Sequence, residues 1–210
     1  MFEIEYKGGN SVIISAKKAK IVTDPKISVV GLKDLSTKGA VELNTEDRFA
    51  TDNPDALLVI KSPGDYGVAG FDIHGVAAKR SIDDESEGMT STMYRVEVDG
   101  ARIGIIGNIH NKLTDEQLEE LGVLDVLVIP VGGNGYTLDA VDAAALVRMI
   151  GPKVVVPVHY KDESIKYEVP QDDLSLFIKD LGAPVEETAK YKFKPSAAPS
   201  PLVVAHIIRS

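Results

Sequence analysis

Hydrophobic and polar residues alternate along residues 2–7 (FEIEYK), which predicts a strand with one buried face. Gly8-Gly9-Asn10 follows and is a hairpin turn signal. Two more short apolar runs, at 11–16 and 20–23, predict an antiparallel meander that ends at Asp24-Pro25. Residues 31–55 are polar, and we expect a loop there with one short strand.

From residue 57 the apolar runs become continuous, which is typical of strands buried on both faces. Such runs and further alternating segments predict strands at 57–60, 71–78, 92–98, 101–106, 125–130, 154–159, 191–193 and 202–208. Turns are predicted at Ser62-Pro63-Gly64-Asp65 and Asp99-Gly100, and the acidic residues 83–88 predict a solvated loop.

Three helices are predicted from capping residues and spacing. Thr114 with Gln117 forms a capping box before a helix that ends at Gly122. Thr137 is the expected cap of a helix to residue 150, and apolar residues at 174, 177, 178 and 181 share one face of a third helix. Strands in hairpins followed by strands alternating with helices predict an α+β fold, with two sheets and helices outside, in a single domain over 1–210.

The composition of the chain excludes some classes of function and limits others. Lys and Arg number 23 against 32 Asp and Glu, so the net charge is −9 and a nucleic-acid surface is not expected. No apolar run approaches the roughly 20 residues of a membrane span, and the acidic N-terminus does not resemble a signal peptide. We therefore expect a cytoplasmic protein without nucleic-acid or membrane partners. There is no cysteine, and four histidines limit metal chemistry.

Candidate site residues follow buried strands, where functional loops collect. The Gly132-Gly133 loop precedes a helix and can be read as an anion cradle or as a tight turn. His159 ends a strand, so it is either a ligand, a base or a structural histidine. Asn108 and His110 leave another strand, and Asp65 lies in a Pro-Gly turn as a metal ligand or a turn residue. His74 and His206 lie within strands, where a structural role is favoured.

The order of several segments resembles the metallo-β-lactamase superfamily, most closely the Zn-dependent hydrolases of the β-lactamase fold that include ascorbate-6-phosphate-lactonase-like proteins. The resemblance covers nearly the whole chain. It is carried by the segments Ile21-Val-Thr-Asp24-Pro25, 55–60, Val128-Ile-Pro-Val-Gly-Gly133, Tyr136-Thr-Leu-Asp139-Ala and Pro152-Lys-Val-Val-Val-Pro-Val-His159-Tyr160. The implied fold is a four-layer αββα sandwich, and family members often assemble into oligomers, so a homo-oligomer is a possible partner state.

The same resemblance implies a zinc site, but the matching positions differ. The family's His-x-His-x-Asp-His loop corresponds to residues 62–66, which contain no histidine, and its Gly-Asp motif corresponds to Gly107-Asn108. The strand expected to end in a histidine ends in Lys79-Arg80 instead. His159 matches a family ligand, and Asp65 is a second candidate match. A catalytic zinc takes three protein ligands and a water, so no metal is expected; if one binds, His159, Asp65 and His110 are the candidate ligands.

Two functions of different classes follow. The first is a non-catalytic binding or assembly protein that keeps the fold without the standard zinc ligands. The second is a hydrolase of a phosphorylated sugar, lactone or phosphoester, with a rebuilt metal or metal-free site at Asp65, Asn108, His110 and His159; only this alternative would use zinc. A weaker possibility is a small anionic ligand held by Gly132, Gly133, Lys79 and Arg80.

Overall fold

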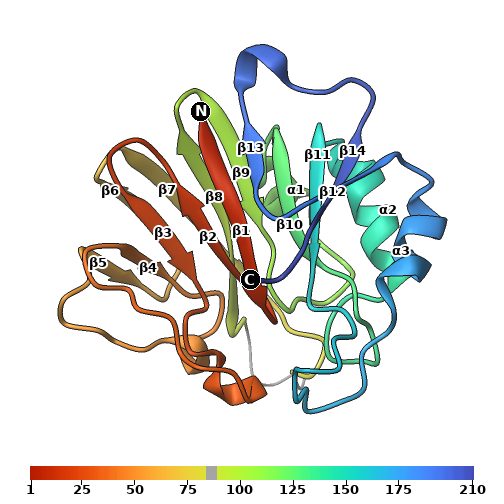
Figure 1. Ribbon diagram of the computed structural model, residues 1–210, viewed down its shortest axis with the longest axis horizontal. Coiled ribbons are helices and arrows are strands. Elements are labelled where there is room, and N and C mark those ends of the chain that lie inside the picture. Colours follow the sequence, from red (N-terminus) through yellow and green to blue (C-terminus); the bar gives the residue numbers. More distant parts are fainter. Residues whose placement is uncertain (84–88) are drawn as a thin grey trace.

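Alternating and continuous apolar runs pair into two mixed sheets in the computed structural model, which describes residues 1–83 and 89–210 (Figure 1). Most of the predicted acidic loop at 83–88 lies outside the described residues. The first sheet has the order β13-β1-β2-β3-β4-β5. Its strands are β1 (Phe2–Gly8), β2 (Ser11–Ser15), β3 (Lys20–Thr23), β4 (Val41–Leu43), β5 (Leu58–Ile60) and β13 (Tyr191–Phe193).

The second sheet has the order β12-β14-β11-β10-β9-β8-β7-β6. Its strands are β6 (Gly64–Val68), β7 (Phe71–Ala78), β8 (Ser91–Val98), β9 (Ala101–Ile105), β10 (Val126–Pro130), β11 (Val154–Val158), β12 (Val185–Thr188) and β14 (Val203–Ile207). Strands β9, β10, β11, β14 and β12 are parallel neighbours, whereas β6 to β9 are antiparallel hairpins. This mixture confirms the α+β class predicted from the order of the patterns.

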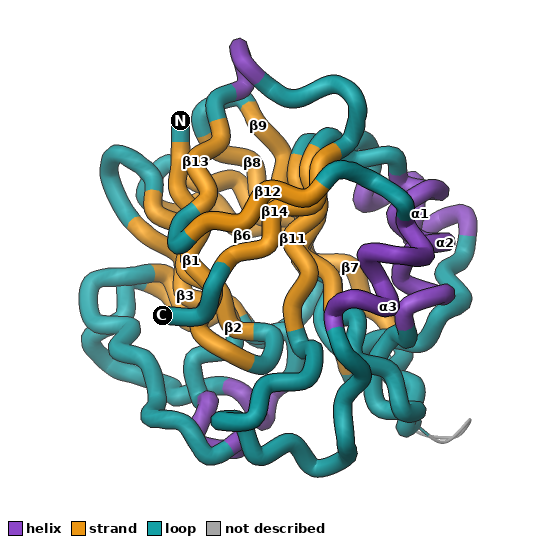
Figure 2. Tube along the Cα trace, turned by 45° about the vertical axis from the view of Figure 1, so that its right-hand side comes forward, coloured by secondary structure: helices purple, strands orange, loops and turns teal. Residues whose placement is uncertain are grey.

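The helices are α1 (Asp115–Leu121), α2 (Ala140–Ile150) and α3 (Leu174–Leu181), with 3₁₀ turns η1 (Ile27–Val30), η2 (Asp47–Phe49) and η3 (Pro195–Ala197). The three α-helices pack on the outer side of the eight-stranded sheet, as Figures 1 and 2 show. None of the helices in the described ranges is long and apolar enough to cross a membrane.

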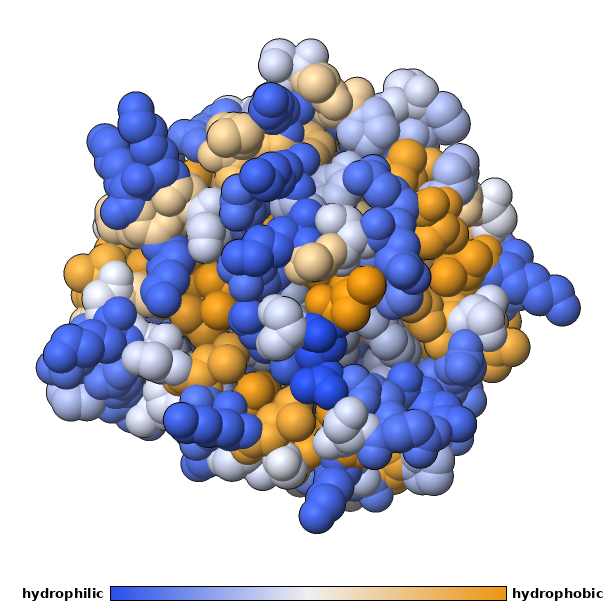
Figure 3. All heavy atoms as spheres, in the orientation of Figure 1, coloured by the Kyte–Doolittle hydropathy of each residue, from blue (hydrophilic) through white to orange (hydrophobic). Residues whose placement is uncertain are grey.

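The main core lies between the two sheets. The inward side chains of β1 (Phe2, Ile4 and Tyr6) meet those of the second sheet, including Val126 and Val156. A second core joins the outer face of that sheet to the helices. Figure 3 shows hydrophobic residues on the surface over the α2 and α3 side, where Val141, Met149 and Leu176 are exposed. The two cores account for why β10 and β11 are apolar at every position.

Some local predictions were wrong. The segment predicted to turn at 62–65 already enters strand β6 at Gly64, where Asp65 pairs with His74 of β7. Strand β12 was not predicted, because its exposed sequence VEET has no apolar alternation and its pairing with β14 holds it. Helix α2 is capped by Asp139, whose side chain accepts a bond from the Asp142 N–H, and not by Thr137. The capping box of α1 is confirmed.

Candidate functional site

The loops that follow several strands meet at one edge of the sandwich, the lower edge in Figure 1. Asp24 follows β3, Asn44–Glu46 follow β4, Asn108 follows β9 and His159 follows β11. Carboxyl ends of parallel strands point to one edge of a sheet, so loops that follow them cluster in space. The turn between β1 and β2 brings Asn10 to the same place, since Asn10 and Asn108 are hydrogen-bonded.

His159 is buried and held in one orientation. Its Nδ1 lies 3.0 Å from Gln171 Oε1, and the Gln171 Nε2 donates to the carbonyls of Val169 and Pro170. Because the amide nitrogen is used in that way, its oxygen faces the imidazole, and Nδ1 must carry the proton. The Nε2 atom is therefore an acceptor. Burial lowers the pKa of His159 to about 4, so the ring is neutral at pH 7.

Two tyrosine rings pack against this imidazole. Tyr136 stacks on His159 with ring centroids 5.8 Å apart, and Tyr167 lies at 4.7 Å with a tilt of 43°. Beyond Tyr136, the guanidinium of Arg48 lies 5.2 Å from the Tyr136 centroid and 4.6 Å from that of Phe49. These five planar groups form a continuous series of contacts that joins η2 to the loops after β10 and β11, and contacts of this kind fix a guanidinium in place.

A buried polar network lies beside the stack. Glu46 is 3% exposed, and its Oε2 contacts Arg80 Nη1 at 2.9 Å and Arg48 Nε at 3.2 Å. Its Oε1 accepts a bond from Asn108 Nδ2, and Asn108 Oδ1 accepts one from Asn10 Nδ2, each at 2.9 Å. A buried carboxylate is stable only when it is paired in this manner. The network is thus neutralised by residues of the protein itself.

Asp24 is the most perturbed carboxyl group at this edge. It is 2% exposed, and it accepts bonds from the N–H and the hydroxyl of Thr45, both at 2.7 Å. Burial outweighs these bonds and raises the pKa of Asp24 to about 7. This carboxyl therefore changes charge near neutral pH.

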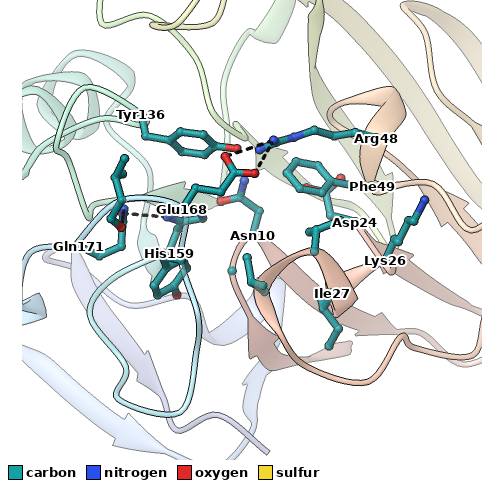
Figure 4. A pocket seen from close by; sticks show the side chains of 15 residues that line it. Asn10, Asp24, Lys26, Ile27, Arg48, Phe49, Tyr136, His159, Glu168 and Gln171 are labelled. Atoms are coloured by element: carbon teal, nitrogen blue, oxygen red, sulfur yellow. Dashed lines mark hydrogen bonds and ion pairs between the residues drawn. The ribbon is translucent and has the colours of Figure 1, made fainter.

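Figure 4 shows the cleft that these groups line. Its charged and polar groups include Asn10, Asp24, Lys26, Arg48, His159, Glu168 and Gln171, and its apolar wall comes from Ile27, Val29, Val30 and Phe49. The free space inside is about 20 Å³, and one water needs roughly 10–15 Å³ on the same measure. The cleft is narrow, and Glu168 reaches across it to Arg48 Nη1 at 3.2 Å.

The structure does not bring together the four residues of the rebuilt hydrolase site. His159 lines the cleft, and Asn108 touches it through Asn10. Asp65 lies on the edge strand β6, where it contacts His74 Nδ1 at 2.6 Å in a different surface pocket. His110 lines a third pocket, and its Nδ1 accepts a bond from the Lys112 N–H. The fourth histidine, His206, contacts Glu187 at 3.2 Å.

The anion site suggested at Gly132, Gly133, Lys79 and Arg80 stays a prediction. The Gly133 N–H donates to the Leu138 carbonyl, and the carbonyl of Gly132 accepts from Asp172. Arg80 pairs with Glu46 and Asp83, and the Lys79 carbonyl accepts from the His110 N–H. Gly132 has a clear packing role, because a Cβ there would lie 2.2 Å from both Gln171 Oε1 and the His159 carbonyl oxygen.

Sequence reasoning did not select several residues of the cleft. Asn10 was assigned to a turn, and Arg48, together with Glu46 of the neighbouring network, fell in a segment predicted as loop. Glu168 and Gln171 follow His159 by 9 and 12 positions, yet no motif marks them. The usable signal was Asp24 before Pro25 at the end of a strand, a pattern that fits a functional loop as well as a turn.

A zinc ion at this edge would need several imidazoles and carboxylates facing one point. Here His159 offers a single imidazole, and the cations Lys26 and Arg48 line the same cleft. Glu46 is already paired with two guanidiniums. In the described part of the chain, no three His, Cys, Asp or Glu side chains are grouped to hold a metal. The residues at this edge do not fit a zinc ion.

The sequence and fold of this protein are similar to those of known proteins. The model of the "Beta-lactamase superfamily domain" matches residues 3–159. A "UPF0173 metal-dependent hydrolase" of Natranaerobius thermophilus is 24% identical over 207 residues, covering 85% of this chain and 90% of that protein.

Two crystal structures are similar over most of their length. One, from Thermotoga maritima, is assigned as a Zn-dependent hydrolase of the metallo-β-lactamase superfamily; it has a TM-score of 0.78 and 25% identity, covering 99% of this chain and all of that one. The other, Igni18, described as a metallo hydrolase of Ignicoccus hospitalis, has a TM-score of 0.67 and 20% identity, covering 92% and 99%. With a family model that spans most of the sequence and a matching fold, this chain belongs to the metallo-β-lactamase branch of the β-lactamase superfamily.

Proposed function

We propose that this protein has lost the standard zinc ligands of its family and acts as a non-catalytic binding protein, with its ligand site in the cleft beside His159. The observation that carries the proposal is the network around Glu46. Its carboxylate is buried between two arginines and Asn108, so charged groups of the protein balance one another at the edge where the family's metal is expected. Two fixed cations there disfavour a dication.

The state of His159 supports binding over catalysis. A general base works best when its pKa lies near the working pH, whereas burial lowers the pKa of His159 to about 4. In the described residues, no serine, threonine or carboxyl group is hydrogen-bonded to the imidazole; its partner is the amide of Gln171. The ring is therefore suited to accepting a hydrogen bond from a ligand at Nε2.

A metal-free hydrolase of a lactone, sugar phosphate or phosphoester is the second candidate. One observation favours it: Gln171 fixes His159 with its Nε2 lone pair available, which is the form that a general base needs. The relatives named as metal-dependent hydrolases also support a hydrolytic ancestry.

Metal analysis separates these possibilities from a standard zinc enzyme. The wild-type protein and His159→Gln would be purified without chelator and analysed by mass spectrometry of the metal content. We expect far less than one zinc per chain in both. Stoichiometric zinc in the wild type that is lost in His159→Gln would overturn the proposal. Hydrolysis of a lactone or a sugar phosphate by the zinc-free wild type, abolished in His159→Gln, would instead establish the second candidate.

A further inference from the structure

The chemistry of the cleft around His159 points to a class of ligand, an inference that rests on the proposed binding function. Aromatic rings and the side chains of Ile27, Val29 and Val30 form its walls. The free space of about 20 Å³ accommodates little more than a water. Any organic ligand must therefore displace a side chain, and the question is which one can leave.

Glu168 is the replaceable side chain. Arg48 pairs on one side with Glu46, which is 2% exposed in its side chain, and on the other with Glu168, which is 54% exposed. The Glu168 oxygens lie 3.2 and 3.5 Å from Arg48 Nη1. Ion pairs of exposed groups contribute only about 0–1 kcal/mol, so exchanging Glu168 for another carboxylate costs little. A guanidinium held by stacking is well suited to receive a carboxylate.

The loop that carries Glu168 is anchored on both sides of it. Lys166 N–H donates to the Val30 carbonyl, and Asp172 N–H donates to the Gly132 carbonyl. Between these anchors, the backbone N–H groups of residues 167–169 make no backbone hydrogen bond among the residues described. A second cavity of about 320 Å³ lies along the same loop and is lined by Tyr167, Glu168 and Val169. Glu168 therefore has space to move away from Arg48.

The cleft also presents two hydrogen-bond acceptors. Asn10 is 6% exposed, and its orientation is fixed because Asn108, bonded to Glu46, offers it an oxygen and not an amide nitrogen. The Asn10 Oδ1 atom is buried and has no hydrogen-bond partner among the described residues. Figure 4 shows this oxygen turned toward His159, whose Nε2 is the second acceptor. A buried acceptor without a donor costs free energy, so the site favours a ligand that supplies an O–H or N–H group.

We propose that the cleft binds a small monocarboxylic acid that carries a hydroxyl or amine, with its carboxylate on Arg48 in the place of Glu168 and its donor directed to Asn10 Oδ1 and His159 Nε2. The apolar wall accommodates a short hydrocarbon portion. Glu168 competes with the ligand from within the chain, and the strength of this competition sets the apparent affinity.

Isothermal titration calorimetry with four matched probes tests the proposal. Lactate and alanine carry both groups, propanoate lacks the donor, and lactamide lacks the carboxylate. We expect lactate or alanine to bind the wild type roughly tenfold more tightly than propanoate, because the donor satisfies the buried acceptor, and lactamide not to bind. Binding of lactate but not alanine identifies a hydroxy acid, and the converse identifies an amino acid.

Three variants locate the site. Glu168→Gln removes the internal competitor and should tighten binding of the preferred acid up to about fivefold. Asn10→Ala should weaken it roughly tenfold while leaving propanoate unchanged. The matched control Glu163→Gln changes another exposed acid of the same loop, one that contacts Lys161 outside the cleft, and should have no effect. Circular dichroism confirms that each variant is folded.

The inference is overturned if none of the four probes binds the wild type and Glu168→Gln, or if Glu168→Gln and Glu163→Gln behave alike. The broader binding function is judged separately by the zinc measurement. Zinc-free protein that binds none of the acids would refute this ligand class alone, whereas stoichiometric zinc would refute the proposed function.

Discussion

Asp24 gives the sharpest test of the electrostatics at this edge, through the variant Asp24→Asn. Burial raises the pKa of this carboxyl from 3.8 to about 7 in the folded protein. The folded state therefore holds a proton between these pH values that the unfolded chain has released. Stability from this group is complete below pH 3.8 and is lost as the pH rises through 7.

The magnitude follows from the size of the shift. A difference of about 3 pH units at 1.36 kcal/mol per unit corresponds to about 4 kcal/mol. Asparagine can accept the Thr45 N–H bond with its oxygen, and its amide can donate to the Thr45 hydroxyl oxygen. The variant is neutral at every pH, so relative to the wild type it should gain about 4 kcal/mol in unfolding free energy between pH 4 and pH 8.

Urea unfolding followed by circular dichroism at several pH values between 4 and 8 measures this difference; the chain has no tryptophan for a fluorescence assay. Asp72→Asn, which replaces an exposed aspartate of β7, controls for loss of a surface charge. The difference between Asp24→Asn and wild type should rise with pH. A difference that is flat, or that falls as the pH rises, would refute the argument that burial dominates at Asp24.

Three further predictions use the same unfolding assay. The lowered pKa of His159 makes the folded state bind fewer protons than the unfolded chain, so the wild type should lose about 3 kcal/mol of unfolding free energy as the pH falls from 6.5 to 4. His159→Gln should not show this loss, and a pH profile like that of the wild type would contradict the prediction. Gly132→Ala should destabilise the protein by about 1–3 kcal/mol because its Cβ would lie 2.2 Å from Gln171 Oε1 and the His159 carbonyl, whereas Gly67→Ala, with 3.8 Å to its nearest neighbour, should be mild. Glu42→Ala should cost about 3 kcal/mol because the Thr51 N–H and Asp52 N–H lose their acceptor; a cost below that of Glu163→Ala would show that these donors find other partners.

The local elements could be predicted because their signals are local. The alternation over residues 2–7 gave β1, and the Thr114–Gln117 box gave the start of α1, since in each case the determining residues are within a few positions. Strand β12 and the entry into β6 were not predicted. Their sequences, VEET and GDYGV, carry no strong pattern, and each is held as a strand by its pairing with a neighbour.

For the site, the sequence indicated positions but not partners. The position of His159 at the end of β11 was predicted, and it lines the cleft. Asp65 was grouped with His159 in one hypothesis because it follows a buried strand and is a candidate match to a family ligand. The strand register instead pairs Asp65 with His74, on the edge strand β6. A turn residue can face either end of its hairpin, so its neighbours follow only from the pairing of the strands.

The sequence by itself determined the α+β class, the three helices and the low number of histidines and cysteines, because each depends on residue types and on short spacings. Only the tertiary structure decided that Asn10 meets Asn108, that Asn108 meets Glu46 and that Arg48 meets Glu168, pairs separated by 98, 62 and 120 positions. These contacts form because packing of the two sheets brings distant strand ends to one edge. There, burial makes an unpaired polar group costly, so Glu46 and Asn108 bond to the groups that the fold brings near them.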